Sequence, residues 1–402
     1  MLFVGDSIMD QQGNHAAVLL RESGIAAEVE AQWGSTLFTP GQYRNGEPNF
    51  ERAPDERSTH WLSIAPELIR RHAPTLVVVE LNHNYWIPFP TDSHGGPIAD
   101  LSSAAAREMV RAQLDAFVGL LRVDGAEVAW VAPTPSDTQS VALWPLMKPV
   151  LDELGVAVID PNRRLRAADG SRRSWARTCT GERSALFLDD RIHLTRLGAG
   201  RSGTELARSV ARAVGLPLID SAAPAEPVVA VVPWGRGGYH LVLCDGSVFH
   251  FGAAPIVGGA RTLIGDGPPV VDARRSPDGG LWLVRADGTV VAVGALPTPL
   301  EFVVRPSAGP VTLAAGDDAY RLVHRDGTVD EFGGVPDLGD ATEVLPNDAF
   351  LAAWAIAHPR PSVSDAAAIN GGYYVVTENG EVVARGEARH HGDLAQLALY
   401  TA

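Results

Sequence analysis

The residues with the clearest chemical potential are a serine near the start of the chain and an aspartate and a histidine near residue 190. Ser7 ends the tripeptide GDS, directly after a short apolar segment. Asp190 and His193 lie three residues apart in the segment DRIHLT, residues 190–195. A serine hydroxyl becomes a nucleophile when a neutral imidazole takes its proton and a carboxylate orients that imidazole. These residue types predict acyl transfer through a serine, provided that the fold brings the two segments together.

The part of the chain that must position these residues, 1–218, is predicted to be an α/β domain with a doubly wound, flavodoxin-like parallel sheet. We expect five short apolar strands, at Leu2–Val4, Ala26–Ala31, Thr75–Leu81, Glu127–Ala132 and Val156–Ile159. Amphipathic helices are expected between and after them, at Gly13–Ser23, Ser58–Arg71, Leu101–Leu121, Ser140–Leu154 and Leu197–Val214. Ser7 would then lie at the carboxyl edge of the sheet, where open α/β folds bind ligands.

Four short blocks together resemble the SGNH, or GDSL-type, hydrolase family. The blocks are GDS at 5–7, WGS at 33–35, LNHN at 81–84 and DRIHLT at 190–195, and the resemblance covers residues 1–215. It implies that Ser7 is the nucleophile, His193 the general base and acid, and Asp190 the partner of the histidine. Hydrolysis by such a site needs no cofactor and no metal. No glycine-rich phosphate loop or zinc-spaced cysteine pair suggests another chemistry.

The resemblance also implies an oxyanion hole formed by the backbone N–H groups of Ser7 and Gly34 and by an asparagine side chain. The third block lacks the glycine that this family usually has before that asparagine, so two alignments compete. We favour Asn84 as the donor, which puts Asn82 at the glycine position, because asparagine adopts the left-handed conformation more readily than glutamate does. In the alternative, Asn82 is the donor and Glu80 stands at the glycine position.

Four further residues are candidates for lining the substrate cleft. His83 lies in the third block and Tyr85 and Trp86 follow it, and their rings suit a sugar ring or an acyl chain. Asp10 lies one turn past Ser7, where it could join a polar network or favour the helix dipole.

The second half of the chain has a different organisation. Residues 219–228 are rich in proline and small side chains, which predicts a linker. Residues 229–402 contain four related units. The units have Asp-Gly or Asn-Gly turns at Asp245, Asp287, Asp326 and Asn379. Each predicts a β-hairpin with a two-residue turn, preceded by one more apolar segment, at Val228–Val232, Val270–Ala273, Val311–Ala314 and Ser364–Ala368. Repeats of this kind are typical of β-propeller blades, and we interpret 348–360 as an insertion.

Composition excludes several classes of protein. The 402 residues carry a net charge of −15, which argues against nucleic acid as a partner. Cys179 and Cys244 allow at most one disulfide, so a disulfide-rich scaffold is excluded. No apolar run predicts a membrane span, and no signal peptide is recognisable, so we expect a cytoplasmic protein, or a secreted one if an upstream segment is missing. Lys148 is the one lysine among 33 basic residues, which fits a GC-rich bacterial genome.

These observations predict a serine esterase acting on O-acyl esters, with an O-acetyl group on a carbohydrate as the leading substrate. Two alternatives stay open. The same residues could transfer the acyl group to a sugar hydroxyl, or the domain could be an inactive scaffold that binds glycan or protein. The repeat half is expected to bind a carbohydrate or a protein partner, on architecture alone.

Overall fold

The computed structural model describes most of the first half of the chain and parts of the second. The described residues are 1–33, 35, 37, 61–82, 102–135, 143–234, 237–276, 279–294, 310–315, 320–324, 328–332, 337–339, 363–369, 372–377 and 382–387. The chain divides into two compact units, Met1–Ala225 and Glu226–Ala402, which are described separately here. No helix among the described residues combines the length and apolarity needed to cross a membrane.

The first unit is built on a five-stranded sheet whose neighbouring strands all pair in parallel. Its strands are β1 (Leu2–Gly5), β2 (Glu28–Ala31), β3 (Leu76–Glu80), β4 (Glu127–Val131) and β5 (Ala157–Ile159). Their order is β2-β1-β3-β4-β5, which is the flavodoxin-like order of a doubly wound fold. The predicted parallel sheet is therefore confirmed.

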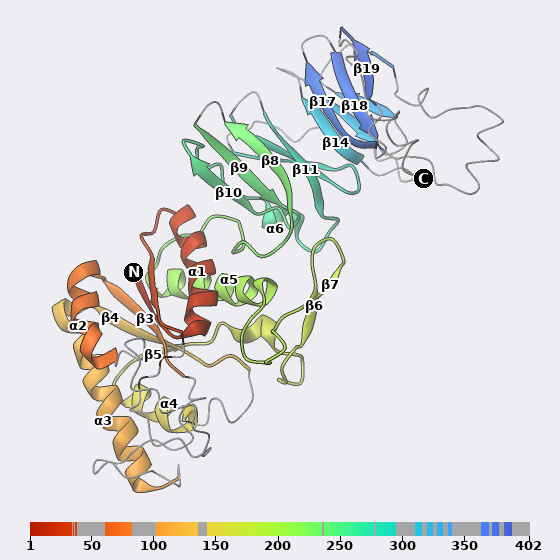
Figure 1. The fold of residues 1–402 in the computed structure, drawn as a ribbon. Coiled ribbons are helices and arrows are strands. Elements are labelled where there is room, and N and C mark those ends of the chain that lie inside the picture. Colours follow the sequence, from red (N-terminus) through yellow and green to blue (C-terminus); the bar gives the residue numbers. More distant parts are fainter. Residues whose placement is uncertain are drawn as a thin grey trace, which may run out of the picture. The chain divides into compact units, whose positions relative to one another are not determined.

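Helices cover both faces of this sheet, because alternate strand residues point to opposite sides (Figure 1). Five long helices are present, α1 (Ser7–Glu22), α2 (Trp61–His72), α3 (Ala104–Leu121), α4 (Trp144–Glu153) and α5 (Arg196–Ala213). Leu2 and Val4 pack with α2, α3 and α4, whereas Phe3 packs with α1 and α5. The described residues of this unit also include two short 3₁₀ turns, at Val123–Gly125 and Asn162–Leu165.

Two parts of the first unit differ from the prediction. Helix α1 begins at Ser7 instead of Gly13, because the Asp6 side chain accepts a hydrogen bond from the Ile8 N–H and caps the helix six residues earlier. A two-stranded hairpin, β6 (Trp175–Arg177) and β7 (Arg183–Ala185), was not predicted. Its strands are three residues long and largely polar, so they have no hydrophobic alternation to detect.

The second unit contains four antiparallel sheets of three strands each among its described residues. In chain order they are β8 (Val228–Trp234), β9 (Gly238–Leu243) and β10 (Val248–Gly252), then β11 (Val270–Arg275), β12 (Leu281–Arg285) and β13 (Val290–Val293), then β14 (Pro310–Ala315), β15 (Tyr320–His324) and β16 (Val329–Phe332), and finally β17 (Val363–Ile369), β18 (Gly372–Thr377) and β19 (Val382–Gly386). A one-turn helix, α6 (Arg261–Ile264), follows the first sheet. The four predicted hairpins, each with a preceding strand, are confirmed.

Successive sheets contact each other through their first strands, β8 with β11, β11 with β14 and β14 with β17. The turns differ in detail from the prediction. In the first two sheets only the glycine has a positive φ, +81° at Gly246 and +88° at Gly288. Each turn is a three-residue loop that ends in this glycine, since Leu243 N–H bonds Ser247 O and Arg285 N–H bonds Thr289 O. The turns at Asp326 and Asn379 and the segment 348–360 lie outside the described residues.

Candidate active site

Ser7 lies at the point where β1 ends and α1 begins, at the carboxyl edge of the sheet. The chain passes close to its neighbours here: a Cβ atom at Gly5 would collide with the carbonyl oxygen of Glu80 and the Cβ of Met9. Only glycine permits this approach, so Gly5 determines how tightly the turn packs on β3 and α1. The Ser7 N–H is among the first in α1 and has no acceptor within the helix.

The loop that carries Asp190 and His193 is shaped by the aspartate itself. Asp190 Oδ1 accepts hydrogen bonds from the backbone N–H groups of Ile192 at 2.9 Å and His193 at 3.0 Å. Between Asp190 and Ile192, Arg191 adopts φ +61°, a left-handed conformation that is strained for a residue with a Cβ. Arg172 holds this conformation by donating to the Arg191 carbonyl at 2.9 Å. One carboxylate thus turns the backbone and leaves its other oxygen free for the histidine ring.

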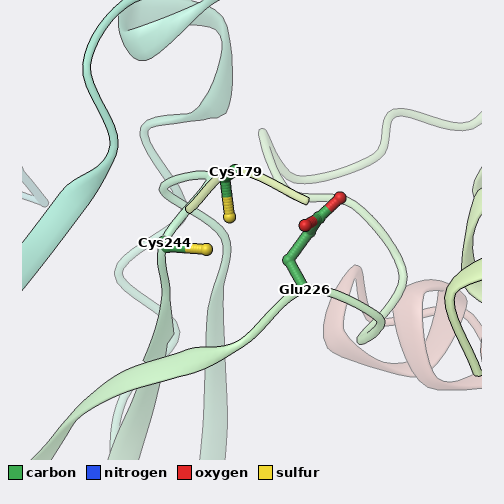
Figure 2. A group of neighbouring side chains, drawn as sticks. All are labelled: Cys179, Glu226 and Cys244. Carbon is green, nitrogen blue, oxygen red and sulfur yellow. The ribbon is translucent and has the colours of Figure 1, made fainter. Parts of the chain in front are cut away.

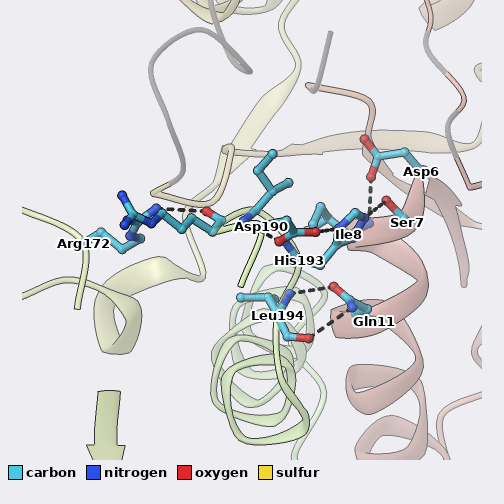
Figure 3. A network of polar contacts seen from close by, with 10 residues as sticks. Asp6, Ser7, Ile8, Gln11, Arg172, Asp190, His193 and Leu194 are labelled. Atoms are coloured by element: carbon cyan, nitrogen blue, oxygen red, sulfur yellow. Dashed lines mark hydrogen bonds and ion pairs between the residues drawn. The ribbon is translucent and has the colours of Figure 1, made fainter. Parts of the chain in front are cut away.

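Ser7, His193 and Asp190 form a continuous hydrogen-bonded chain (Figure 3). Ser7 Oγ lies 2.8 Å from His193 Nε2, and His193 Nδ1 lies 2.5 Å from Asp190 Oδ2. The side chains of His193 and Asp190 are 25% and 43% exposed, so water has access to these two members of the hydrogen-bonded series. The structure brings together three residues that the sequence singled out from segments far apart.

The pKa of Asp190 lies below its ordinary value. Partial burial opposes this shift, but hydrogen bonds from the His193 ring and from the backbone N–H groups of Ile192 and His193 outweigh it. Asp190 is therefore a carboxylate at neutral pH. An anionic partner on Nδ1 leaves Nε2 of a neutral imidazole free to accept a proton from Ser7.

Gln11 joins the helix of Ser7 to the loop of His193. Its side-chain amide donates to the Leu194 carbonyl at 3.1 Å and accepts from the Leu194 N–H at 2.9 Å. This paired contact lies one turn beyond Ser7 and one residue beyond His193 (Figure 3). Gln11 was not predicted as a site residue, because nothing local marks a glutamine whose partner is 183 residues away.

Trp33 lies against the outer face of the candidate site. Its ring stacks on the His193 ring with centroids 5.9 Å apart and an angle of 18° between the planes. Asp10 accepts a hydrogen bond from the Trp33 indole N–H at 2.7 Å, and Trp33 remains 62% exposed. Asp10, a cleft candidate, therefore positions an exposed aromatic ring beside the histidine. Trp33 itself was missed, although it stands in the second block beside Gly34.

A buried polar network lies on the inner side of the Ser7 turn. Gln12 donates to Glu80 Oε2 at 2.5 Å and accepts a hydrogen bond from Ser202, and all three side chains are fully buried. Burial raises the pKa of Glu80 well above its ordinary value, and the negative charge of Asp6 adds to the effect. Hydrogen bonds from Gln12 and Asn82 oppose the shift. Glu80 is thus favoured in its neutral form directly beneath the turn.

Of the two asparagines considered for the oxyanion hole, the structure describes Asn82 and not Asn84. Asn82 is buried, donates to the Val131 carbonyl at 2.7 Å and accepts from the Trp130 indole N–H at 2.9 Å. Its amide therefore joins β3 to β4. The other donor candidates Gly34 and Asn84, and the cleft candidates His83, Tyr85 and Trp86, lie outside the described residues.

The residue types found in metal sites include those of Cys179, Glu226 and Cys244, which are labelled in Figure 2. Both cysteines are disulfide-bonded. A metal ion binds the cysteine thiolate, which a disulfide does not provide. We therefore assign no metal to this group.

No family model and no curated protein sequence matches this chain. Several solved structures resemble it over about half its length. A provisionally assigned lipolytic protein of the G-D-S-L family from Desulfitobacterium hafniense is 12% identical, with 52% of this chain and 97% of that one covered and a TM-score of 0.33. The psychrotrophic esterase EstA from Pseudoalteromonas sp. is 13% identical, with 53% and 97% covered and a TM-score of 0.33.

TesA is 16% identical, with 52% of this chain and 96% of that one covered and a TM-score of 0.32. Because every one of these TM-scores lies below 0.5, we draw no functional conclusion from the similarities. The interpretation of the site depends on its own geometry.

Proposed function

We propose that this chain is a serine esterase that hydrolyses O-acyl esters through an acyl-serine intermediate. One observation carries the proposal: Ser7 Oγ, the two ring nitrogens of His193 and the Asp190 carboxylate are joined by contacts of 2.8 and 2.5 Å. Ser7 and His193 are 186 residues apart in the sequence, so the contact requires the whole domain to be folded. A nucleophile, a base and an orienting acid in this order are the components of serine-based acyl transfer.

In the proposed reaction, Ser7 Oγ attacks the ester carbonyl carbon while His193 Nε2 takes the hydroxyl proton. The resulting imidazolium is stabilised by the Asp190 carboxylate on Nδ1, and its outer face meets the Trp33 ring. His193 then returns the proton to the leaving alcohol, which leaves the acyl group on Ser7. Water, activated by the same imidazole, attacks the acyl-serine and releases the acid.

The oxyanion of the tetrahedral intermediate would be stabilised by the Ser7 N–H at the start of α1, by Gly34 and by Asn84. The engagement of the Asn82 amide with Val131 and Trp130 favours Asn84 over Asn82 as the side-chain donor. Each such donor lowers the barrier by about 3 kcal/mol in acyl-transfer enzymes.

We place the substrate among short-chain O-acyl esters, with an O-acetyl group on a carbohydrate first. The exposed indole of Trp33 beside His193 supports this choice, since an aromatic face can pack against a sugar ring. Transfer of the acyl group to a sugar hydroxyl is the second candidate. The exposure of His193 and Asp190 favours water over a bound acceptor, and therefore hydrolysis over transfer.

The test is hydrolysis of p-nitrophenyl acetate by the full chain beside its Ser7→Ala and Ser209→Ala variants. Ser209 lies on α5 and is a matched control for the loss of a hydroxyl. We expect Ser7→Ala to lose about 10³-fold or more in kcat and Ser209→Ala to match the wild type. A fluorophosphonate probe should label Ser7, as read by mass spectrometry. Equal rates in the wild type and Ser7→Ala, without labelling, would refute the proposal.

For the second unit we propose a small β-propeller that binds a carbohydrate or a protein. Four three-stranded sheets that contact one another through their first strands support this proposal. A glycan array probed with the full chain and with the Ser7→Ala variant would show whether a ligand is held independently of turnover.

A further inference from the structure

Positive charge is concentrated in one segment of an otherwise acidic protein. Residues 163–201 contain ten arginines and four acidic residues, whereas the whole chain has a net charge of −15. This segment includes the β6–β7 hairpin and ends in the first turns of α5. It also carries Asp190 and His193, so the basic surface belongs to the same part of the fold as the candidate active site.

Four of these arginines line one cavity of about 650 Å³, which we call the arginine cavity. They are Arg172, Arg173, Arg177 and Arg201, and Ser174 and Trp175 lie between them in the lining. The described lining includes no carboxylate. Trp175 is 42% exposed, with the Arg183 guanidinium 3.9 Å from its ring centroid. The cavity therefore offers several guanidinium groups and an indole to a ligand.

Three of the four arginines are oriented by backbone carbonyl groups. Arg172 donates to the Arg191 carbonyl at 2.9 Å, Arg177 to that of Gly181 at 2.7 Å, and Arg201 to that of Arg177 at 2.6 Å. Within the described part of the chain, no carboxylate pairs with Arg172, Arg173 or Arg177. Carbonyl contacts fix the side chains of Arg172 and Arg177 but do not neutralise their charge. Unneutralised, oriented guanidinium groups are suited to bind carboxylate, sulfate or phosphate through paired hydrogen bonds.

A second cavity, of about 500 Å³, shares lining residues with the arginine cavity and is lined by part of the loop of the candidate active site. Arg172 and Ser174 line both cavities, and the second is also lined by Asp189 and Arg191, the two neighbours of Asp190. Arg172 bonds the Arg191 carbonyl within this loop (Figure 3). A ligand in the arginine cavity would therefore lie next to the segment that carries the proposed base.

We propose that the arginine cavity binds an anionic group of the substrate, so that the ester cleaved at Ser7 is carried by a molecule bearing a carboxylate, sulfate or phosphate. This inference names the substrate class of the Ser7 site and rests on the proposed esterase function. Binding of the anion itself needs no turnover, so it can be measured separately.

The experiment is isothermal titration calorimetry on the full-length Ser7→Ala protein at low salt. The probes are tetragalacturonate, inorganic sulfate and inorganic phosphate, with maltotetraose as the neutral control. We expect the anions but not maltotetraose to bind, more weakly as sodium chloride is added. The ranking of the three anions identifies which group the cavity prefers.

Variants locate the binding to the cavity. Arg173→Gln combined with Arg177→Gln should weaken anion binding about tenfold, because two charge-assisted contacts are lost. Arg107→Gln combined with Arg111→Gln removes the same charge from α3 and should leave the affinity unchanged. If the first pair unfolds the protein, Arg173→Gln alone serves, since its side chain has no described partner.

Unchanged affinity in the cavity variants, equal binding of maltotetraose, or no binding of any anion would overturn the inference. Each of these results is independent of the p-nitrophenyl acetate assay. An inactive wild-type protein that still binds anions in the cavity would refute the esterase proposal alone.

Discussion

The two sides of the turn at Ser7 hold carboxyl groups whose pKa values are shifted in opposite directions. On the outer side, Asp190 is half exposed and receives three hydrogen bonds from N–H groups, which keep its pKa below the ordinary value. On the inner side, Glu80 is fully buried near the negative charge of Asp6, and its pKa is raised well above the ordinary value. The comparison teaches that burial, hydrogen-bond donors and neighbouring charges, more than proximity to the nucleophile, decide the direction in which a carboxyl pKa is shifted.

The same contrast extends to the roles of the surrounding side chains. Asp190 and Trp33 contact His193 from outside and are open to water. Gln12, Glu80 and Ser202 contact one another in the interior, away from solvent. Changes on the outer side should therefore alter turnover, and changes on the inner side should alter stability. Four predictions test this division.

The largest effect is expected for Asp190→Asn. The amide cannot hold His193 in the tautomer that accepts a proton on Nε2, so kcat for p-nitrophenyl acetate should fall about 10³- to 10⁴-fold. The melting temperature should change little, because the side chain is half exposed. Asp189→Asn, at the neighbouring position, is the control. A large loss of stability in Asp190→Asn would mean that the outer side also supports the fold.

Gln12→Met should have the next largest effect, on stability. Methionine is similar in length but cannot hydrogen-bond, so Glu80 and Ser202 would each lose their contact with Gln12 in the interior. We expect the free energy of unfolding to fall by about 2 to 3 kcal/mol in urea titrations, with kcat close to wild type at temperatures where the protein is folded. Asn14→Ala, exposed on the same helix, should leave both quantities unchanged.

Glu80→Gln should change how stability depends on pH. The raised pKa means that the folded protein keeps a proton that the unfolded chain releases near the ordinary glutamate value. Wild-type stability therefore falls as pH rises from that value towards the raised pKa, by up to about 1.4 kcal/mol per pH unit. Glutamine does not titrate, so the stability of the variant relative to wild type should increase between pH 5 and pH 8.

Chemical denaturation at several pH values measures this difference, with Glu108→Gln on the exposed face of α3 as the matched control. A constant difference across the pH range would show that Glu80 has the same pKa in the folded and unfolded states. The inner side would then no longer differ from the outer side in the way described above.

The smallest effect is expected for Trp33→Ala. Removal of the ring takes away its contact with the His193 imidazolium, which at an exposed position is worth about 0.5 to 1 kcal/mol. The value of kcat/KM should fall a few-fold, and Trp33→Phe should recover most of it by restoring an aromatic face. A loss as large as that of Asp190→Asn would indicate that Trp33 also contacts the substrate.

The parts of the fold that could be predicted from the sequence are those with a local signal. All five strands of the parallel sheet were located within two residues, since buried parallel strands are short and apolar. The early start of α1 was missed, because it depends on how the Asp6 side chain meets the Ile8 N–H. The β6–β7 hairpin was missed because its strands are short and polar, although it carries part of the arginine cavity.

The candidate site shows the same limit. Ser7, Asp190 and His193 stand in recognisable short motifs, and the resemblance to a known family connected them. Gln11 and Gln12 stand in no such motif, and their partners lie elsewhere in the chain. Trp33 stands in the second block, but nothing in that block indicates its contact with His193. Their contacts arise only when α1, α5 and the second block are packed around the sheet. Burial and neighbouring charge, which determine the state of Glu80, are likewise properties of the folded chain.

The paired contact of Gln11 with Leu194 has a consequence for how this region can vary. Gln11 bonds the backbone N–H and carbonyl groups of residue 194, which every amino acid except proline provides. This contact therefore constrains the number of residues between Asp190 and Leu194 more than it constrains their identities. Substitutions at 191 and 192 can be accommodated, whereas an insertion or deletion of one residue would shift His193 away from Ser7. Libraries that aim to alter specificity should therefore vary residues 191 and 192 at constant loop length and keep Asp190 and His193.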